Sequence, residues 1–264
     1  MSADAVNSSR GTSNVLDGCT ALVTGATGGI GRAVSFVLAS RGATVAVQSR
    51  RRDRALNLVN ELNQISTSGS CGAFVADFSK PTDTQRLCEE VIAAVPQINL
   101  LVAVAGADVL TGEPAQWDFN RKLQELLAVD VTSTMQLCRG IGRHFCARGS
   151  GTILTIGWDQ AETGMEGDSG ELFAATKGAV MQFTKSLAKS LAPKVRVNCV
   201  APGWIRTSWG EKASQQWQDR ACRESLLERW GTPEDVAHTI AWLAGPDAVF
   251  VTGQVIAVNG GLRR

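Results

Sequence analysis

A glycine-rich turn near the N-terminus constrains this chain more than any other stretch. Residues 24–31 read TGATGGIG, after the apolar run 21–24 and before a segment with apolar residues at helical spacing. Glycine has no Cβ, so its backbone can adopt positive φ and let another molecule approach closely. A helix that starts at such a turn offers unpaired N–H groups and a partial positive charge to a pyrophosphate. The order of strand, glycine turn and helix therefore predicts a dinucleotide site rather than a purely structural turn.

Strand-like and helix-like segments alternate along the whole chain. This alternation predicts a doubly wound, Rossmann-type α/β fold, with a parallel sheet of about seven strands covered by helices on both faces. We expect strands at 19–24, 44–48, 72–76, 98–104, 152–156, 195–200 and 254–258, and helices at 30–41, 53–63, 81–94, 118–147, 171–191 and 232–244.

The composition fits one large domain. The chain has 264 residues, of which 44% are apolar and 19% charged, so it can bury a substantial core. It shows no internal repeat and no linker, so we expect a single domain over 17–264. Residues 1–16 are polar and are expected to form a disordered tail, whereas the polar, helix-rich segment 208–230 has the composition of a mobile substrate lid.

Charge and residue usage argue against several other classes of protein. The net charge is +1, and the basic run at 50–54 is too short for a nucleic-acid surface. No apolar segment reaches the roughly 18 residues that a membrane span needs. The seven cysteines are scattered without a C-x-x-C pair, which favours reduced thiols in a cytoplasmic protein. His144 and His238 stand in helical patterns away from the glycine turn, and we expect no metal site.

Further motifs stand at the ends of the predicted strands. With the turn 24–31 they are Asp77, residues 105–106, Lys177, the stretch NCVAPGWIRT at 198–207 and the VNGG at 258–261. Together these motifs resemble those of the short-chain dehydrogenase/reductase family, in its compact branch with the 3-oxoacyl-carrier-protein reductases. The resemblance covers about 18–264 and implies a nicotinamide cofactor, a small-molecule substrate and a homotetramer or dimer built on the helices after strands four and five.

The end of the second predicted strand indicates which nicotinamide cofactor binds. NAD-binding folds place an acid there to hold the ribose 2′-hydroxyl, and that acid would repel a 2′-phosphate. Here Ser49 takes the place of the acid and Arg50 follows, and a guanidinium can hold a phosphate through two parallel hydrogen bonds. A solvated basic turn is the alternative, but we expect NADP(H).

The glycine turn and the resemblance together predict a set of cofactor-binding residues. Asp77 is expected to cap the adenine and Phe78 to pack near it, while Lys177 would hold the nicotinamide ribose. The full set is Gly25, Thr27, Gly28, Gly29, Ile30, Gly31, Ser49, Arg50, Arg51, Asp77, Phe78, Ala105, Gly106, Lys177, Pro202, Gly203, Ile205 and Thr207.

The active-site pattern of the family is interrupted in this chain. The family uses a tyrosine acid, a lysine four residues later, a serine after strand five and an asparagine on the helix after strand four. By resemblance, Phe173 stands at the tyrosine, Trp158 at the serine and Asp130 at the asparagine, and Lys177 alone is kept. A phenyl ring has no proton to give, and the chain contains no tyrosine.

Two interpretations remain open. In the first, the protein is a reductase that uses another acid or reduces a planar C=N or carbonyl substrate, with Asp159 as the first candidate acid and Asp168 behind it, although either could belong to a solvated loop. In the second, it is a non-catalytic NADP(H)-binding pseudo-enzyme or subunit. The first predicts Lys177, Asp159 and Asp130 as catalytic residues, and Trp158, Asp168, Phe173 and Trp204 as the substrate pocket.

Tryptophans favour the first interpretation over simple loss of catalysis. Trp158 and Trp204 lie in segments that wall the substrate pocket in the family and could stack on a planar substrate. Trp209 and Trp217 either extend that wall or pack the helices of 208–230 onto the domain.

Overall fold

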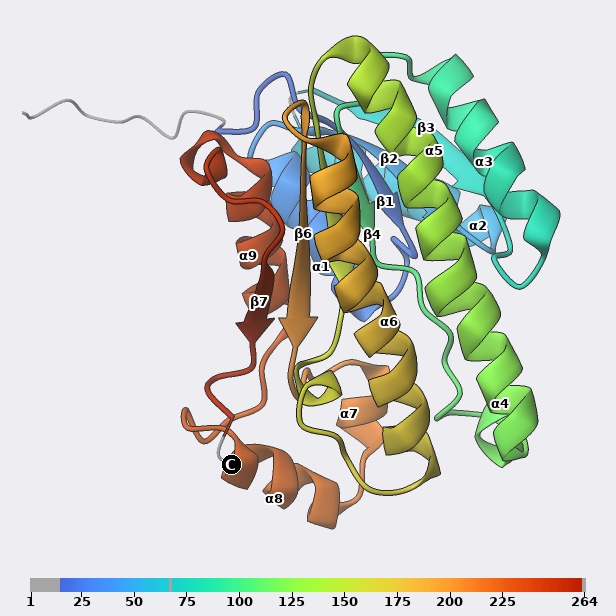
Figure 1. Ribbon diagram of the computed structural model, residues 1–264, viewed down its shortest axis with the longest axis vertical. Coiled ribbons are helices and arrows are strands. Elements are labelled where there is room, and N and C mark those ends of the chain that lie inside the picture. The colour runs from blue at the N-terminus through green and yellow to red at the C-terminus, as the bar shows by residue number, and fades with distance from the viewer. Residues whose placement is uncertain (1–14, 67, 263–264) are drawn as a thin grey trace, which may run out of the picture.

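Seven parallel strands form one sheet in the computed structural model, which describes residues 15–66 and 68–262 (Figure 1). Their order across the sheet is β3-β2-β1-β4-β5-β6-β7. The predicted doubly wound parallel sheet is therefore confirmed. The strands are β1 (Thr20–Thr24), β2 (Thr44–Ser49), β3 (Ser70–Val75), β4 (Leu100–Ala103), β5 (Gly151–Ile156), β6 (Val195–Pro202) and β7 (Val255–Val258).

Helices cover both faces of the sheet because successive side chains of a strand point to opposite faces. Val23 of β1 packs into the core on one face, with α1, α2 and α9, and Leu22 packs into the core on the other, with α3, α5 and α6. The main helices are α1 (Gly29–Ser40), α2 (Arg52–Ile65), α3 (Pro81–Ala94), α4 (Phe119–Leu126), α5 (Ser133–Arg148), α6 (Asp168–Leu191), α7 (Ser208–Lys212), α8 (Gln215–Glu224) and α9 (Pro233–Ala244).

The segment predicted as one helix over 118–147 is divided by a wider turn. α4 leads into a π-helical turn over Leu127–Thr132, and α5 continues from Ser133. The Ser133 hydroxyl donates to the Val129 carbonyl at 2.5 Å inside this turn. A π turn holds one residue more than an α-turn, and apolar periodicity alone does not reveal it. The helix predicted at 171–191 also differs from the structure, because α6 begins earlier, at Asp168. It follows Gly167, whose φ is +86°.

The structure describes all of the predicted lid but only the last two residues of the predicted N-terminal tail. Residues 1–14 of the predicted tail lie outside the described residues. Leu16, also assigned to the tail, is 3% exposed and its N–H donates to the Arg41 carbonyl at 2.9 Å, so it belongs to the packed chain. The predicted lid 208–230 contains α7 and α8.

The carboxyl ends of the strands meet at one edge of the sheet, and α7 and α8 lie beyond that edge (Figure 1). β1 pairs with β2 on one side and with β4 on the other, so the strand order reverses at β1. Ligands of open α/β sheets bind at such a reversal, outside the carboxyl ends. None of the helices in the described ranges is long and apolar enough to cross a membrane.

We expect the packing of α2 against the sheet to depend on its inner face alone. Leu62 is fully buried and Leu56, on the same helix, is 42% exposed. Leu62→Ala should lower the free energy of unfolding by about 2–5 kcal/mol, because it leaves a cavity. Leu56→Ala, the matched control, should change it by about 0.5 kcal/mol or less. Urea unfolding at a fixed protein concentration measures both, and equal losses would contradict the assignment of the buried face.

Candidate functional site

The glycine turn between β1 and α1 forms a cradle that side chains would fill. Gly25 has φ +59°, and a Cβ placed on it would lie 2.7 Å from the Cα of Ala105. A Cβ on Gly31 would lie 2.2 Å from the carbonyl oxygen of Gly25. Only glycine fits either position, so the turn holds the start of α1 close to the ends of β1 and β4.

The open side of this cradle suits a pyrophosphate. Gly28 and Gly29 are exposed at the start of α1. Among the described residues no side chain caps α1, and its first turn carries no acid. The first N–H groups of a helix have no intrahelical acceptors, so they and the helix dipole favour an anion here. The residues present therefore fit a dinucleotide, and Ile30 lies half-buried behind them.

The end of β2 carries a hydroxyl where an acid would select NAD. Ser49 is 5% exposed, and its Oγ lies 2.9 Å from the Oγ1 of Thr27, which fixes the end of the strand against the glycine turn. The Arg51 guanidinium is held by Asp53, with Nε to Oδ1 at 3.1 Å. Arg50 is exposed and makes no ion pair with any residue that the structure describes. Arg50, rather than Arg51, is thus the available cation next to Ser49, and the exposed Arg52 and Arg54 follow on α2.

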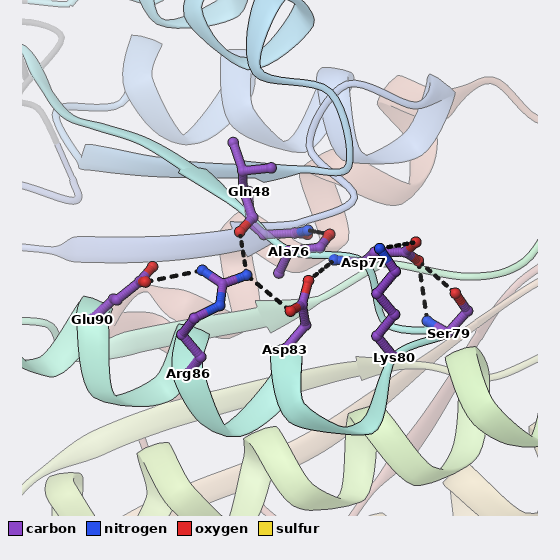
Figure 2. A network of polar contacts seen from close by, with 9 residues as sticks. Gln48, Ala76, Asp77, Ser79, Lys80, Asp83, Arg86 and Glu90 are labelled. Carbon is purple, nitrogen blue, oxygen red and sulfur yellow. Dashed lines mark hydrogen bonds and ion pairs between the residues drawn. The ribbon is translucent and has the colours of Figure 1, made fainter.

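A polar network holds the loop after β3, where Asp77 stands (Figure 2). The Asp77 Oδ1 accepts from the N–H of Ser79 at 3.2 Å and from its hydroxyl at 2.8 Å. The Asp77 N–H donates to the Asp83 Oδ2 at 2.8 Å. This network holds Asp77 at the carboxyl edge, where it is 34% exposed. Phe78, predicted beside the adenine, is instead 5% exposed in the core with α3 and α5, so its ring is surrounded by protein.

Lys177 on α6 is ion-paired with Asp130, which the π turn carries. The Lys177 Nζ lies 2.7 Å from the Asp130 Oδ2, and the two side chains are 13% and 1% exposed. The Asp130 Oδ1 accepts from the Ala107 N–H at 2.7 Å. Gly106 approaches this carboxylate so closely that a Cβ there would lie 3.2 Å from Oδ2. The structure therefore joins two of the predicted catalytic residues to the loop after β4.

Two aromatic rings, which the resemblance predicts at the positions of a serine and a tyrosine, lie side by side. Trp158, after β5, and Phe173, on α6, contact edge to face with ring centroids 6.4 Å apart. Phe173 also packs against a small apolar cluster of Val109, Leu126 and Leu172. Both rings are half-buried, so this corner of the site is apolar and offers no hydroxyl to a substrate oxygen.

The two candidate acids occupy different environments. Asp159 is 8% exposed; its Oδ1 accepts from the Gln160 N–H at 2.8 Å and its Oδ2 from the Asn259 Nδ2 at 3.0 Å. Burial raises the pKa of Asp159, while these hydrogen bonds act in the opposite direction. Its side chain faces Gly203 and Asn259, at the exits of β6 and β7. Asp168, by contrast, is exposed at the first residue of α6.

The segment after β6 brings Thr207 to the glycine turn. Pro202 ends β6 opposite Val258, and the Gly203 N–H donates to the Val258 carbonyl at 3.1 Å. Ile205 is 8% exposed and belongs to the core on the α1 face. The Thr207 Cγ2 would lie 3.1 Å from a Cβ on Gly29, so this threonine stands beside the N-terminal end of α1.

Four tryptophans of the segment 204–230 form one cluster, which we call the tryptophan cluster. Ring centroids of neighbouring members lie 5.4–6.1 Å apart. Trp209 and Trp217 therefore pack α7 and α8 onto the domain, the second of the two alternatives. The members are Trp204, Trp209, Trp217 and Trp230.

Sequence reasoning missed two members of this region, Trp230 and Glu224. Trp230 is 4% exposed at the end of the lid segment, and only its place in an aromatic-rich stretch hinted at its role. The Glu224 Oε2 accepts from the Trp204 Nε1 at 2.7 Å and from the Gln160 Nε2 at 3.4 Å. One carboxylate of α8 thus ties the loop after β5 to the segment after β6.

The doubly wound sheet, the side-chain-free start of α1 and the strand reversal at β1 define a dinucleotide-binding α/β protein. A family profile described as "Enoyl-(Acyl carrier protein) reductase" matches residues 25–263. The 3-oxoacyl-[acyl-carrier-protein] reductase FabG of Aquifex aeolicus (strain VF5) is 34% identical over 251 residues, covering 94% of this chain and 98% of that protein. The nodulation protein G of Rhizobium sp. (strain N33) is 32% identical over 253 residues, with the same coverage.

Solved structures agree with these relatives. A putative NAD(P) dependent gluconate 5-dehydrogenase from Beutenbergia cavernae, with bound NADP at low occupancy, is 33% identical with a TM-score of 0.83, covering 94% of this chain and 97% of that one. A 7α-hydroxysteroid dehydrogenase complexed with NADH and 7-oxo glycochenodeoxycholic acid is 26% identical with a TM-score of 0.84, covering 95% and 96%. The chain belongs to the short-chain dehydrogenase/reductase family of NAD(P)-dependent oxidoreductases and resembles its 3-oxoacyl-carrier-protein reductases.

The attachment of the lid should depend on Glu224. Glu224→Ala removes the acceptor of three donors, from Trp204, Gln160 and Arg220, so α8 should open locally more often. Since a hydrogen bond to a charged group contributes about 1.5–3 kcal/mol, tryptic cleavage within 208–230 should become roughly tenfold faster. Glu211→Ala on exposed α7 is the control and should leave the cleavage rate unchanged. Equal rates in both variants would show that Glu224 does not hold the lid.

Proposed function

We propose that this protein is an NADP(H)-dependent reductase of the short-chain family whose active site works without a tyrosine acid. The observation that carries the proposal is the ion pair between Lys177 and Asp130, with 2.7 Å between Nζ and Oδ2. Lys177 of the family pattern is kept and pairs with Asp130, which stands at the asparagine position, although two aromatic rings stand at the positions of the hydroxyl donors.

The preference for NADP(H) rests on the end of β2. Ser49 presents no charge that would repel a 2′-phosphate, and Arg50 is exposed beside it without an ion pair among the described residues. Of the predicted phosphate ligands, Arg51 contributes less because Asp53 already holds its guanidinium. Gly28, Gly29 and the first turn of α1 would hold the pyrophosphate, and Asp77 the adenine.

Lys177 and Asp130 would supply the polar chemistry of the site. When bound, NADPH supplies a hydride. The Lys177 ammonium has three N–H groups, of which one direction is taken by Asp130, so it can also donate to a ribose hydroxyl or to a substrate atom. Asp130 orients the ammonium, and the Ala107 N–H and the π turn orient Asp130 in turn. Lys177 is therefore the proposed proton donor and Asp130 its positioning partner.

Asp159, the first candidate for the proton donor, lies in an environment that favours a structural role instead. Both of its oxygens accept hydrogen bonds, from Gln160 and Asn259, and it is almost fully buried. It is better placed to hold the loop after β5 against the exit of β7 than to meet a substrate. Asp168, exposed on α6, remains a candidate contact for the substrate.

The apolar corner formed by Trp158 and Phe173 favours a planar substrate. The two rings provide area for stacking, and of the two only Trp158 carries a hydrogen-bond donor, its indole N–H. A C=N group, which can accept a hydride when protonated, needs less stabilisation of negative charge on the reacting atom than a ketone does. We therefore propose a planar C=N compound or conjugated carbonyl compound as the substrate.

A non-catalytic role is the second candidate function. Lys177 is already neutralised by Asp130, and both Asp159 oxygens are engaged within the protein. A protein with these contacts could bind NADP(H) as a pseudo-enzyme or subunit without turnover.

Arg50 should determine the preference between the two cofactors. Arg50→Gln is expected to weaken NADPH binding about tenfold, because a charge-assisted pair to the 2′-phosphate is lost, and to leave NADH binding unchanged. Arg54→Gln removes the same charge one helical turn away on exposed α2 and serves as the control. Calorimetric titration with each cofactor measures the ratio. Tight NADH binding by the unaltered protein, or an unchanged ratio in Arg50→Gln, would refute the preference for NADP(H).

Turnover separates the two candidate functions. NADPH oxidation should be measured with ketones, cyclic imines and pterin-like compounds, for the unaltered protein, for Lys177→Met and for Phe173→Tyr combined with Trp158→Ser. We expect the unaltered protein to reduce C=N compounds, Lys177→Met to lose about 10²-fold or more of that activity, and the double variant to gain ketone reduction. NADPH binding without turnover of any compound would favour the non-catalytic role.

A further inference from the structure

The guanidinium of Arg220 on α8 is held by a helix neighbour on its inner edge and by an exposed loop residue on its outer edge. Its Nε donates to the Glu224 Oε1 at 2.6 Å, within the same helix. Its guanidinium carbon lies 5.1 Å from the ring centre of Trp217 and 6.0 Å from that of Trp204. The Arg220 side chain is 22% exposed, so the tryptophan cluster and Glu224 hold it in one orientation.

The outer edge of this guanidinium is occupied by Glu166 from the loop between β5 and α6. The Arg220 Nη1 donates to the Glu166 Oε1 at 2.7 Å, and Nη2 donates to Oε2 at 3.4 Å. This is a two-point contact between a guanidinium and a carboxylate. The Glu166 side chain is 76% exposed, so solvent screens its attraction to Arg220 and the ion pair is weak.

The neighbours of Arg220 place this contact on the side of the molecule where the carboxyl ends of the strands lie. Glu224, which orients Arg220, also accepts from Trp204 after β6 and from Gln160 after β5. These two segments follow the strands whose carboxyl ends form the edge where ligands bind. α8 lies beyond that edge in Figure 1.

We propose that the outer edge of Arg220 is a recognition site for a carboxylate on the substrate, and that Glu166 occupies it when no substrate is bound. The substrate would then be a planar compound bearing a carboxylate away from the reacting carbon. The inference rests on the proposed function, because it takes the substrate to enter at this edge. An arginine whose orientation is fixed in advance loses little entropy on binding, and its fork matches a carboxylate. Removal of an exposed internal competitor should therefore strengthen binding of an external carboxylate.

The matched pair Glu166→Ala and Glu162→Ala tests this competition. Both residues are exposed on the loop between β5 and α6, and Glu162 makes no ion pair within 15–66 or 68–262. The probe is 2-naphthoate, with neutral 2-naphthamide for comparison, titrated by calorimetry with and without NADPH. Glu166→Ala should bind 2-naphthoate about two- to fivefold more tightly than the unaltered protein, and Glu162→Ala should bind it equally. Naphthamide should bind with one affinity to all three proteins.

Variants of Arg220 test the other partner. Arg220→Gln should weaken 2-naphthoate binding about tenfold. Arg220→Lys keeps the charge and controls for loss of fold, and its affinity for 2-naphthoate should lie between those of Arg220→Gln and the unaltered protein. The proposal is wrong if Glu166→Ala gains no affinity over Glu162→Ala, or if Arg220→Gln binds 2-naphthoate as well as the unaltered protein does. Titration of the same samples with NADPH reports the proposed function separately. The two titrations therefore give separate answers: a variant can lose 2-naphthoate binding and keep NADPH binding, or lose NADPH binding and keep 2-naphthoate binding.

Discussion

A single buried amide joins the three strands that form the cofactor side of the sheet. Gln48 of β2 is 1% exposed; its Oε1 accepts from the Gly25 N–H at 2.9 Å and its Nε2 donates to the Ala76 carbonyl at 2.8 Å. One side chain thus joins the glycine turn after β1, the end of β2 and the loop after β3, and its contact with Ala76 is drawn in Figure 2. Each of these groups would be costly to bury without a partner, so the amide determines how the ends of the strands are spaced. Ser49 and Asp77 directly follow Gln48 and Ala76 in the chain, so this contact contributes to placing them, and Arg50 beside Ser49, at the carboxyl edge.

The sequence predicted best what depends on neighbours in the chain. The glycine turn, the alternation of strands and helices and the exposure of Arg50 are local properties, and each could be read from residue types and spacing. The relatives confirm the family and the fold. Phe78 was misjudged because its position in the sequence says nothing of which face of the chain it turns to, and in the structure it faces the core.

The contacts that could not be predicted join distant segments. Asp159 meets Asn259, which lies 100 residues away, and no pattern in either segment indicates the pairing. The ion pair of Lys177 with Asp130 depends on the π turn. The spacing of apolar residues does not reveal the extra residue in that turn. The tryptophan cluster was half visible in the sequence. Three of its members, Trp204, Trp209 and Trp217, were singled out from the sequence, but whether they lined a pocket or packed a helix depended on the fold of 208–230.

The π turn also restricts how this protein can change its length. Each residue of an α-helix turns the chain by about 100°, so deletion of one residue between 127 and 132 would restore the regular ladder and rotate everything on one side of it. Asp130 would then leave Ala107 and Lys177, or α4 would leave Leu172 and Phe173, and both contacts could not survive. An insertion or deletion in this segment therefore disturbs the site more than a substitution does, even at its exposed position Leu127.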